Sequence, residues 1–210
     1  MKTLIVPFVN LDGQDLDQVM ELQAARFDVD TVNWPEVYSY APLCAGRIAR
    51  TRDSLVVDFR VSGLDLRAAN KEDNGSQWED SCVEFFVADP DGSVYYNFEV
   101  NALGKVLACS GASRQNRTHR PVEEMKTITR FATVQYVDGV KEGLQDWRVG
   151  IIIPFGLIGI DPENLPPSIR ANFYKCGDRT AHPHFVSWNP IHTPQPDFHR
   201  PDFFGELRFQ

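Results

Sequence analysis

The sequence has 210 residues, of which 42% are hydrophobic and 24% are charged, as in an ordinary globular domain. This composition excludes long disorder, collagen and coiled coils. Twenty-nine acidic and 21 basic side chains give a net charge of −8, so we expect no nucleic-acid partner. No stretch approaches the roughly 20 apolar residues that cross a bilayer, so we expect no membrane partner.

The start of the chain and its cysteines bear on the cellular compartment. Residues 1–9 contain one lysine and a brief apolar run, but no small-residue cleavage site follows. We predict a cytoplasmic location for the chain as given, and a secreted one if the chain is a processed form. The four cysteines are spread singly with no C-x-x-C pair, which predicts neither a zinc knuckle nor a dithiol redox motif. We expect buried free thiols.

One helix is predicted near the start of the chain. Asp15 and Gln18 have the spacing of a capping box, and apolar residues recur at helical spacing through residues 15–27. We assign residues 1–32 to an N-terminal extension that contains this helix. Residues 33–210 then form the main domain.

The main domain has the alternating pattern of β-strands, with turn residues between the runs. Ten strands are predicted, at residues 46–50, 54–62, 81–88, 94–101, 105–110, 128–137, 146–154, 169–176, 185–188 and 205–209. The turn Asp89-Pro90-Asp91-Gly92 joins two of them as an antiparallel hairpin. Ten strands and one helix predict an all-β fold, an antiparallel two-layer β-sandwich of jelly-roll type with a short N-terminal helix.

Alternation divides the hairpin strands into an apolar face and a face of polar and aromatic side chains. The second face carries Cys82, Glu84, Phe86, Tyr95, Asn97, Glu99 and Asn101, and a later strand adds Arg170, Asn172 and Tyr174. The outer face of a sandwich is often only solvated. However, Asn, Arg, Glu and Tyr are planar donors and acceptors that also suit ligand binding, so both interpretations stay open.

The four tryptophans differ in their setting. Trp147 alternates in phase with neighbouring apolar residues, which predicts a core position. Trp78 follows a polar loop, and Trp188 stands where a strand gives way to Asn189-Pro190. Two indoles at loop edges could flank a flat ligand such as a pyranose ring, or both could be partly buried loop anchors.

Two groups of residues are candidates for a metal site or a catalytic site. His182 and His184 with Asp178 or Asp197 could be drawn as a zinc site, but a proline separates the two histidines and no H-E-x-x-H motif is present, so we expect none. Glu84 and Glu99 share a face and could be a glycosidase pair, although glutamates facing water or hydroxyls are far commoner.

With these residues in view, the chain resembles carbohydrate-binding module family 9, in the form of single-domain bacterial family-9-like proteins. The resemblance covers residues 33–210. It rests on the segments 78–86 (WEDSCVEFF), 96–99 (YNFE) with Asn101 and Gly104, Arg114, Trp147 leading to 153–155 (IPF), 170–178 (RANFYKCGD), 187–190 (SWNP) and 204–207 (FGEL).

The resemblance implies a β-sandwich that holds a mono- or oligosaccharide between two tryptophans, with Glu, Asn and Arg side chains hydrogen-bonding the hydroxyls. On the residues that match, the implied ligand-binding set is Trp78, Glu84, Asn101, Arg114, Asn172, Lys175 and Trp188. The family also implies structural calcium, whose ligands we do not map onto this chain. We expect no other cofactor.

Family-9 modules usually accompany secreted glycoside hydrolases, whereas this chain shows neither a catalytic domain nor a signal peptide. That difference weakens plant polysaccharide as the ligand more than it weakens sugar binding. We therefore predict a non-catalytic carbohydrate-binding protein. The alternative is a glycan-processing enzyme that uses Glu84 and Glu99. A haem-binding sandwich is disfavoured, because only three methionines are present and none is placed to face a strand histidine.

Overall fold

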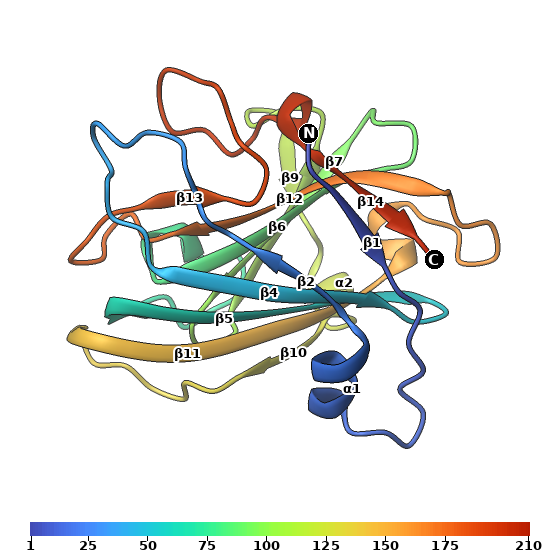
Figure 1. The fold of residues 1–210 in the computed structure, drawn as a ribbon, viewed down its shortest axis with the longest axis horizontal. Coiled ribbons are helices and arrows are strands. Elements are labelled where there is room, and N and C mark those ends of the chain that lie inside the picture. The colour runs from blue at the N-terminus through green and yellow to red at the C-terminus, as the bar shows by residue number, and fades with distance from the viewer.

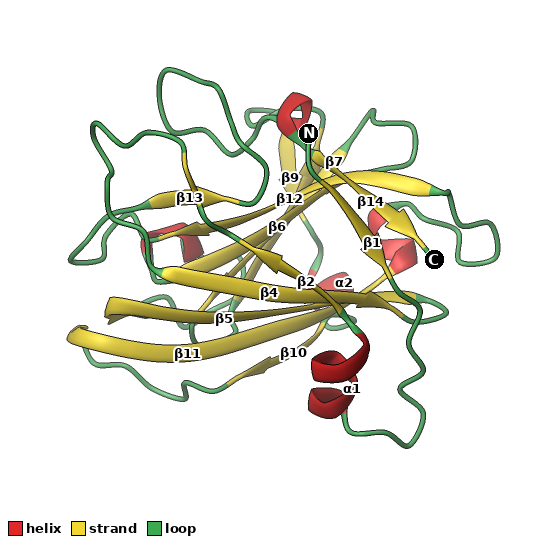
Figure 2. Ribbon diagram, in the orientation of Figure 1, coloured by secondary structure: helices red, strands yellow, loops and turns green.

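Two β-sheets face each other in the structure, a computed structural model that describes residues 1–210 (Figure 1). Sheet A has nine strands and sheet B has five, and only short helices lie beside them (Figure 2). All paired strands are antiparallel except β1 and β14, which run parallel. The predicted all-β sandwich is confirmed.

Sheet A follows the order β1-β14-β12-β6-β7-β8-β9, with β13 and β3 continuing from β12. Its strands are β1 (Thr3–Val6), β3 (Thr31–Val32), β6 (Cys82–Ala88), β7 (Tyr95–Asn101), β8 (Val106–Gly111), β9 (Arg117–His119), β12 (Ser168–Cys176), β13 (Phe185–Ser187) and β14 (Gly205–Phe209). Sheet B follows the order β10-β11-β5-β4-β2, with β2 (Ala25–Asp28), β4 (Leu43–Arg50), β5 (Ser54–Arg67), β10 (Thr129–Ala132) and β11 (Val140–Pro154). The helical elements are α1 (Leu16–Gln23), α2 (Val122–Met125) and the 3-10 turns η1 (Gln77–Glu79), η2 (Phe155–Ile158) and η3 (Pro201–Phe203). Neither α-helix has the length and apolar character needed to cross a bilayer.

All ten predicted strands are present, although several ends differ. The largest differences are in β11, which begins at Val140 rather than at residue 146, in β10, which ends at Ala132 rather than at residue 137, and in β5, which ends at Arg67 rather than at residue 62. Four strands were not predicted: β1, β2, β3 and β9. Each has four residues or fewer, which is too short for alternation to be visible in the sequence.

Helix α1 is shorter than the predicted segment. It begins at Leu16, where the Asp15 side chain accepts a hydrogen bond of 2.9 Å from the backbone N–H of Gln18, as the capping pattern predicts. It ends at Gln23, because the next residues pair as β2 with β4. In β2 the Phe27 ring lies over Gly46, where an added Cβ would be 2.1 Å from the ring, and it stacks 3.8 Å from the ring of Phe173. Burial between the sheets thus ends the helix before residue 27.

The expected N-terminal extension, residues 1–32, is instead part of the sandwich. Strand β1 pairs with β14 at the edge of sheet A, and β2 pairs with β4 at the edge of sheet B (Figure 1). Helix α1 connects these two strands. The structure therefore has no boundary between residues 32 and 33.

The core lies between the sheets and follows the predicted alternation. Val83, Phe85 and Val87 of β6 point into it, and Trp147 of β11, which is 3% exposed, meets them from sheet B. The other face of sheet A is covered as well. Its aromatic residues, Phe86, Tyr95 and Tyr174, form a second cluster with loop residues Trp34, Ile191, Phe198 and Phe204. Its polar side chains are therefore buried beneath loops, except where a pocket opens between those loops.

Candidate functional site

The pocket lies on the face of sheet A that is turned away from sheet B, and it has a volume of about 340 Å³. Strands β6, β7 and β12 form its floor, and loops near residues 38, 78, 114 and 197 form its walls. Its lining residues are Tyr38, Trp78, Glu84, Glu99, Arg114, Arg117, Cys176, Asp178, Phe185, Gln195, Pro196, Asp197, Phe198 and His199.

Two glutamates form the polar floor. Glu84 and Glu99 stand directly opposite each other across the β6–β7 pair, and each is 3% exposed. Asn97 donates a hydrogen bond of 3.0 Å to Oε1 of Glu99, and Nη1 of Arg117 lies 3.8 Å from the same oxygen. Oε2 of Glu99 is buried without a partner in the protein. A buried acceptor without a partner is costly, so its presence in a pocket indicates a place for a donor from a ligand or from water.

Burial changes the ionisation of this floor. Burial, together with the negative charge of Glu99, raises the pKa of Glu84 well above its usual range. Burial also raises the pKa of Glu99 to about 7, although Arg117 opposes the increase. At the rim, removal of solvent by the surrounding protein and the nearby Glu79 raise the pKa of Asp178 to about 6. Near pH 7 the Glu84 carboxyl group is therefore neutral and can donate as well as accept hydrogen bonds, whereas Glu99 is divided between its neutral and charged forms.

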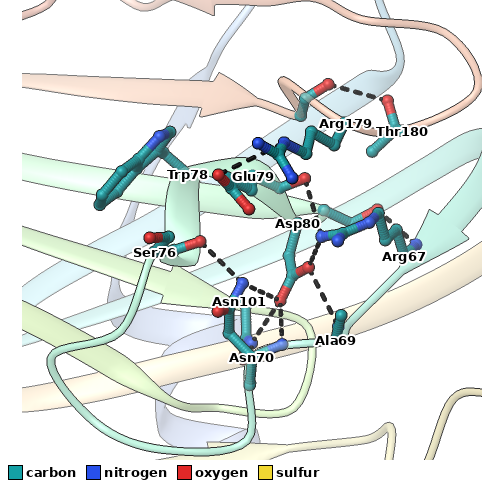
Figure 3. A network of polar contacts seen from close by, with 12 residues as sticks. Arg67, Ala69, Asn70, Ser76, Trp78, Glu79, Asp80, Asn101, Arg179 and Thr180 are labelled. Atoms are coloured by element: carbon teal, nitrogen blue, oxygen red, sulfur yellow. Dashed lines mark hydrogen bonds and ion pairs between the residues drawn. The ribbon is translucent and has the colours of Figure 1, made fainter.

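Trp78 supplies an aromatic surface at the pocket edge, where 38% of its surface is exposed. It lies in η1 between the loop 70–76 and Asp80, whose buried carboxylate holds this loop (Figure 3). Asp80 accepts hydrogen bonds from the backbone N–H groups of Ala69 and Asn70 at 3.0 and 2.9 Å and forms an ion pair with Arg67. The position of the indole is thus fixed by a charged group beneath it.

The walls combine arginines, carboxylates and aromatic rings. Nη1 of Arg114 lies 3.6 Å from Oδ1 of Asp197, and the Arg117 guanidinium reaches toward Glu99. Burial and the two arginines lower the pKa of His199 to about 3, so its imidazole is neutral. On another side, Tyr38 and Phe185 pack edge to face with ring centres 4.7 Å apart.

The structure brings three of the seven predicted ligand-binding residues into this pocket: Trp78, Glu84 and Arg114. The other four, Asn101, Asn172, Lys175 and Trp188, are buried and do not line it. Asn101 instead belongs to the Asp80 network, since its Nδ2 donates to Oδ2 of Asp80 at 3.0 Å and to the carbonyl oxygen of Asn70 at 2.7 Å (Figure 3).

Asn172 and Lys175 also satisfy groups within the protein. Oδ1 of Asn172 accepts from the N–H of Asn189 at 2.8 Å, and its Nδ2 donates to the carbonyl oxygen of the same residue at 3.0 Å. Lys175 points toward the interior between the sheets, where Nζ donates to the carbonyl oxygen of Cys176 at 2.5 Å and to Nε2 of His184 at 2.7 Å. Both residues hold the chain after β12 in place.

Trp188 is 4% exposed and belongs to the main core cluster, so the predicted clamp of two tryptophans is not formed. Its ring meets the Phe173 ring at 72° with centres 5.5 Å apart. It also lies against Gly205, where an added Cβ would be 2.3 Å from the indole. Because glycine has no side chain, residue 205 leaves the space in which this indole is buried.

Several pocket residues were not in the predicted binding set: Tyr38, Glu99, Arg117, Asp178 and His199. Alternation does place Glu99 on the same face as Glu84, and this pattern supports a ligand contact as well as the catalytic alternative. Arg117 and His199 arrive from segments far away in the sequence. No spacing pattern relates them to β6.

The residues do not fit the calcium implied by the family resemblance. Calcium takes six to eight oxygen ligands. Metal-ligating side chains come together in one place only, at Cys82, Glu84 and Cys176, and two of these are thiols. The buried carboxylate of Asp80 is already saturated by N–H donors. None of the late histidines belongs to the Cys82 group.

A larger and shallower hollow of about 850 Å³ lies over sheet B. Its arginines are already paired: Arg60 contacts Glu21 at 2.8 Å, and Arg148 contacts Asp58 and Asp17, each at 2.8 Å. We therefore place the candidate site in the smaller pocket, where an acceptor without a partner, Oε2 of Glu99, and an exposed indole meet.

Comparison with known proteins agrees with the fold. The family model for carbohydrate-binding family 9 matches residues 14–209. The chain belongs to carbohydrate-binding family 9. A presumed carbohydrate-binding protein from Bacteroides uniformis ATCC 8492 is 32% identical to this family-9 chain, with a TM-score of 0.88 over 100% of this chain and 99% of the other.

Two further family-9 structures share the fold at lower identity. Both are of a module from Caldicellulosiruptor kristjanssonii, one in complex with glucose and one with cellotriose, at 13% identity and a TM-score of 0.60. The alignments cover 100% of this chain and 96% and 94% of the two other chains. A search of curated proteins found no match. The resemblance noted in the sequence is thus confirmed at the level of the family and the fold.

Proposed function

We propose that the pocket binds one sugar residue of a mono- or oligosaccharide, without making or breaking a bond. The observation that carries the proposal is the meeting of an exposed indole, Trp78, with two buried carboxyl groups, Glu84 and Glu99, in one pocket of about 340 Å³. A pyranose presents C–H groups to an aromatic face and hydroxyl groups at its edge, so it needs both kinds of surface together. Family membership and the sugars bound by the Caldicellulosiruptor module support this ligand class.

The proposed contacts differ from the predicted clamp in one respect. Trp78 stacks on one face of the sugar, and the edge-to-face pair of Tyr38 and Phe185 supplies the second aromatic surface in place of Trp188. The hydroxyl groups reach Glu84, Glu99 and Arg117. Because a sugar hydroxyl both donates and accepts, it can satisfy a neutral carboxyl group and the free Oε2 of Glu99 alike.

One observation favours a second candidate function, a retaining or inverting glycoside hydrolase. Glu84 and Glu99 are direct cross-strand partners, both open to the pocket, and the pKa of each is raised. A raised carboxyl pKa is what a general acid needs. We nevertheless propose binding alone, because the family is one of binding modules and burial is the main cause of both raised pKa values.

Glu84→Gln separates the two functions. A hydrogen bond contributes roughly 0.5–1.5 kcal/mol, so losing one that the neutral Glu84 carboxyl group makes should weaken sugar binding by up to about tenfold. A hydrolase would instead lose turnover on aryl glycosides while keeping or improving sugar retention. Calorimetry with glucose and cellotriose, and product release from aryl glycosides, should be measured on the same two proteins.

Glu142→Gln is the matched control, because Glu142 is exposed on β11 and does not line the pocket. It should change neither readout. Cleavage by the parent protein that disappears in Glu84→Gln would overturn the binding-only proposal. If the parent binds no saccharide on a glycan array, the ligand class itself is wrong.

A further inference from the structure

Beneath the proposed sugar pocket, two thiols and a carboxylate meet at one point. Cys82 of β6 and Cys176 of β12 are direct cross-strand partners, and Glu84 is two residues farther along β6 on the same face. Cys176 Sγ donates to Oε1 of Glu84 at 3.0 Å. The two sulfur atoms and the carboxylate oxygen all lie within 4.8 Å of one another.

We propose that Cys82, Glu84 and Cys176 bind a zinc ion, with its fourth coordination position open toward the pocket. Thiolates bind at about 2.3 Å from zinc and carboxylates at about 2.0–2.2 Å, so tetrahedral ligand atoms stand roughly 3.5–3.8 Å apart. The present separations, 3.0 Å between Cys176 Sγ and Glu84 Oε1 and at most 4.8 Å for the other two pairs, lie on either side of these values. Two sulfur ligands favour zinc over magnesium or calcium, which prefer oxygen.

The ion has a route to this position and a free coordination site. Cys176 and Glu84 line the pocket, whereas Cys82 lies behind them. Three protein ligands with one open position is the arrangement of zinc sites that bind water or a substrate oxygen, whereas structural zinc sites have four protein ligands. A water molecule or a sugar hydroxyl would complete the coordination from the pocket side.

Binding displaces protons from the thiols. Burial raises the pKa of Cys82 to about 12 and that of Cys176 well above its usual range, so both are protonated in the metal-free protein. Zinc replaces the two thiol protons, which pass to solvent, and no oxidant or reductant is needed. Binding should therefore strengthen as pH rises.

The charges around the cluster act in both directions. Glu99 on β7 and Asp178 after β12 favour a cation beside Glu84, and Arg117 on β9 opposes it. Lys175, whose side chain points to the other face of sheet A, acts on both thiols and favours the thiolate form. Zinc carries two positive charges into a site that otherwise contains three carboxyl groups, Glu84, Glu99 and Asp178, and two nearby guanidinium groups, Arg114 and Arg117.

The test is a metal titration without sugar. Protein dialysed against a chelator is mixed with Zn²⁺, separated from free metal and analysed for zinc. The parent should retain one equivalent. Cys82→Ser and Cys176→Ser should each weaken retention at least about 100-fold, because each removes one of three ligands. Cys109→Ser is the control, since Cys109 is buried in β8 outside the cluster. This variant should retain as much zinc as the parent.

Cobalt substitution covers the case in which a serine variant does not fold. Co²⁺ bound by two thiolates gives near-ultraviolet charge-transfer absorption and tetrahedral visible bands in the parent protein. Three results would each overturn the proposal. They are absence of these bands, absence of zinc from the folded parent protein, and retention of zinc by folded Cys82→Ser and Cys176→Ser that equals retention by the parent. Sugar affinity of the chelator-treated protein is measured separately, so failure of this site is distinguishable from failure of sugar binding.

Discussion

Replacing Trp78 with alanine should weaken sugar binding by up to about 50-fold without unfolding the protein. The indole exposes 38% of its surface, which for a side chain of about 250 Å² leaves about 95 Å² available to a ligand. At about 25 cal/mol per Å², covering all of this area contributes about 2.4 kcal/mol. A sugar that covers half of it gains about 1.2 kcal/mol, so the expected loss of affinity lies between about 7-fold and 50-fold.

Stability should change little, because the backbone contacts of this residue survive the substitution. The carbonyl oxygen of Trp78 accepts from the N–H of Asp178 at 3.1 Å, and alanine keeps that bond. The melting temperature should stay within about 4 °C of the parent value. Isothermal calorimetry with cellotriose, together with a thermal melt, measures both quantities. Phe8→Ala is the control, since Phe8 is 51% exposed and does not line the pocket.

Unchanged affinity in a folded Trp78→Ala protein would refute the stacking argument. Loss of affinity together with a large fall in melting temperature would show instead that the indole supports the fold.

Three further predictions follow from burial. Trp188→Ala should lower the free energy of unfolding by about 3–5 kcal/mol, measured by urea denaturation, because the core loses a packed indole; a change below about 1 kcal/mol would contradict its core position. Asp80→Asn should cost about 3–5 kcal/mol, since it leaves Arg67 without its buried partner, and should also weaken sugar binding by releasing the loop before Trp78; full affinity would show that the loop needs no such anchor. Burial raises the pKa of Glu99 from 4.5 to about 7, so the folded protein holds a proton that the unfolded chain releases, and stability falls as pH rises through this window. Glu99→Gln has no proton to lose, so its free energy of unfolding should not show this fall. The difference between variant and parent should therefore shift in favour of the variant from pH 5 to pH 8, and parallel pH profiles would exclude the raised pKa.

The sheets could be predicted from the sequence because their strands are long enough for alternation to show. In β6, the alternation of Val83, Phe85 and Val87 with Cys82 and Glu84 gives both the strand and its two faces. The edge strand β1 has only four residues and pairs with a strand about 200 positions later, so nothing local identifies it. Its register depends on β14.

The site could be predicted only where a residue's role depends on its own strand. Alternation fixes the face of Glu84 and a polar loop precedes Trp78, and the family resemblance then gives both residues a role in sugar binding. Trp188 was misplaced because its position depends on Gly205, which leaves room for the indole. Asn101 and Asn172 carry the same amide groups that bind sugars, but here those groups hydrogen-bond loops. Chemical type alone does not distinguish a ligand contact from a loop anchor.

The order of strands in sheet A has a consequence for folding during synthesis. Sheet B is complete once residue 154 has been made, because all five of its strands precede that point. Sheet A remains incomplete until β14, which lies between β1 and β12, has been synthesised. The pocket also needs β12 and the loop around His199, so the nascent chain carries the paired carboxyl groups of β6 and β7 without their cover until residue 199 has been synthesised. The pocket therefore cannot form before the segment around residue 199 has been synthesised, and until then the edge of sheet A exposes unpaired backbone groups.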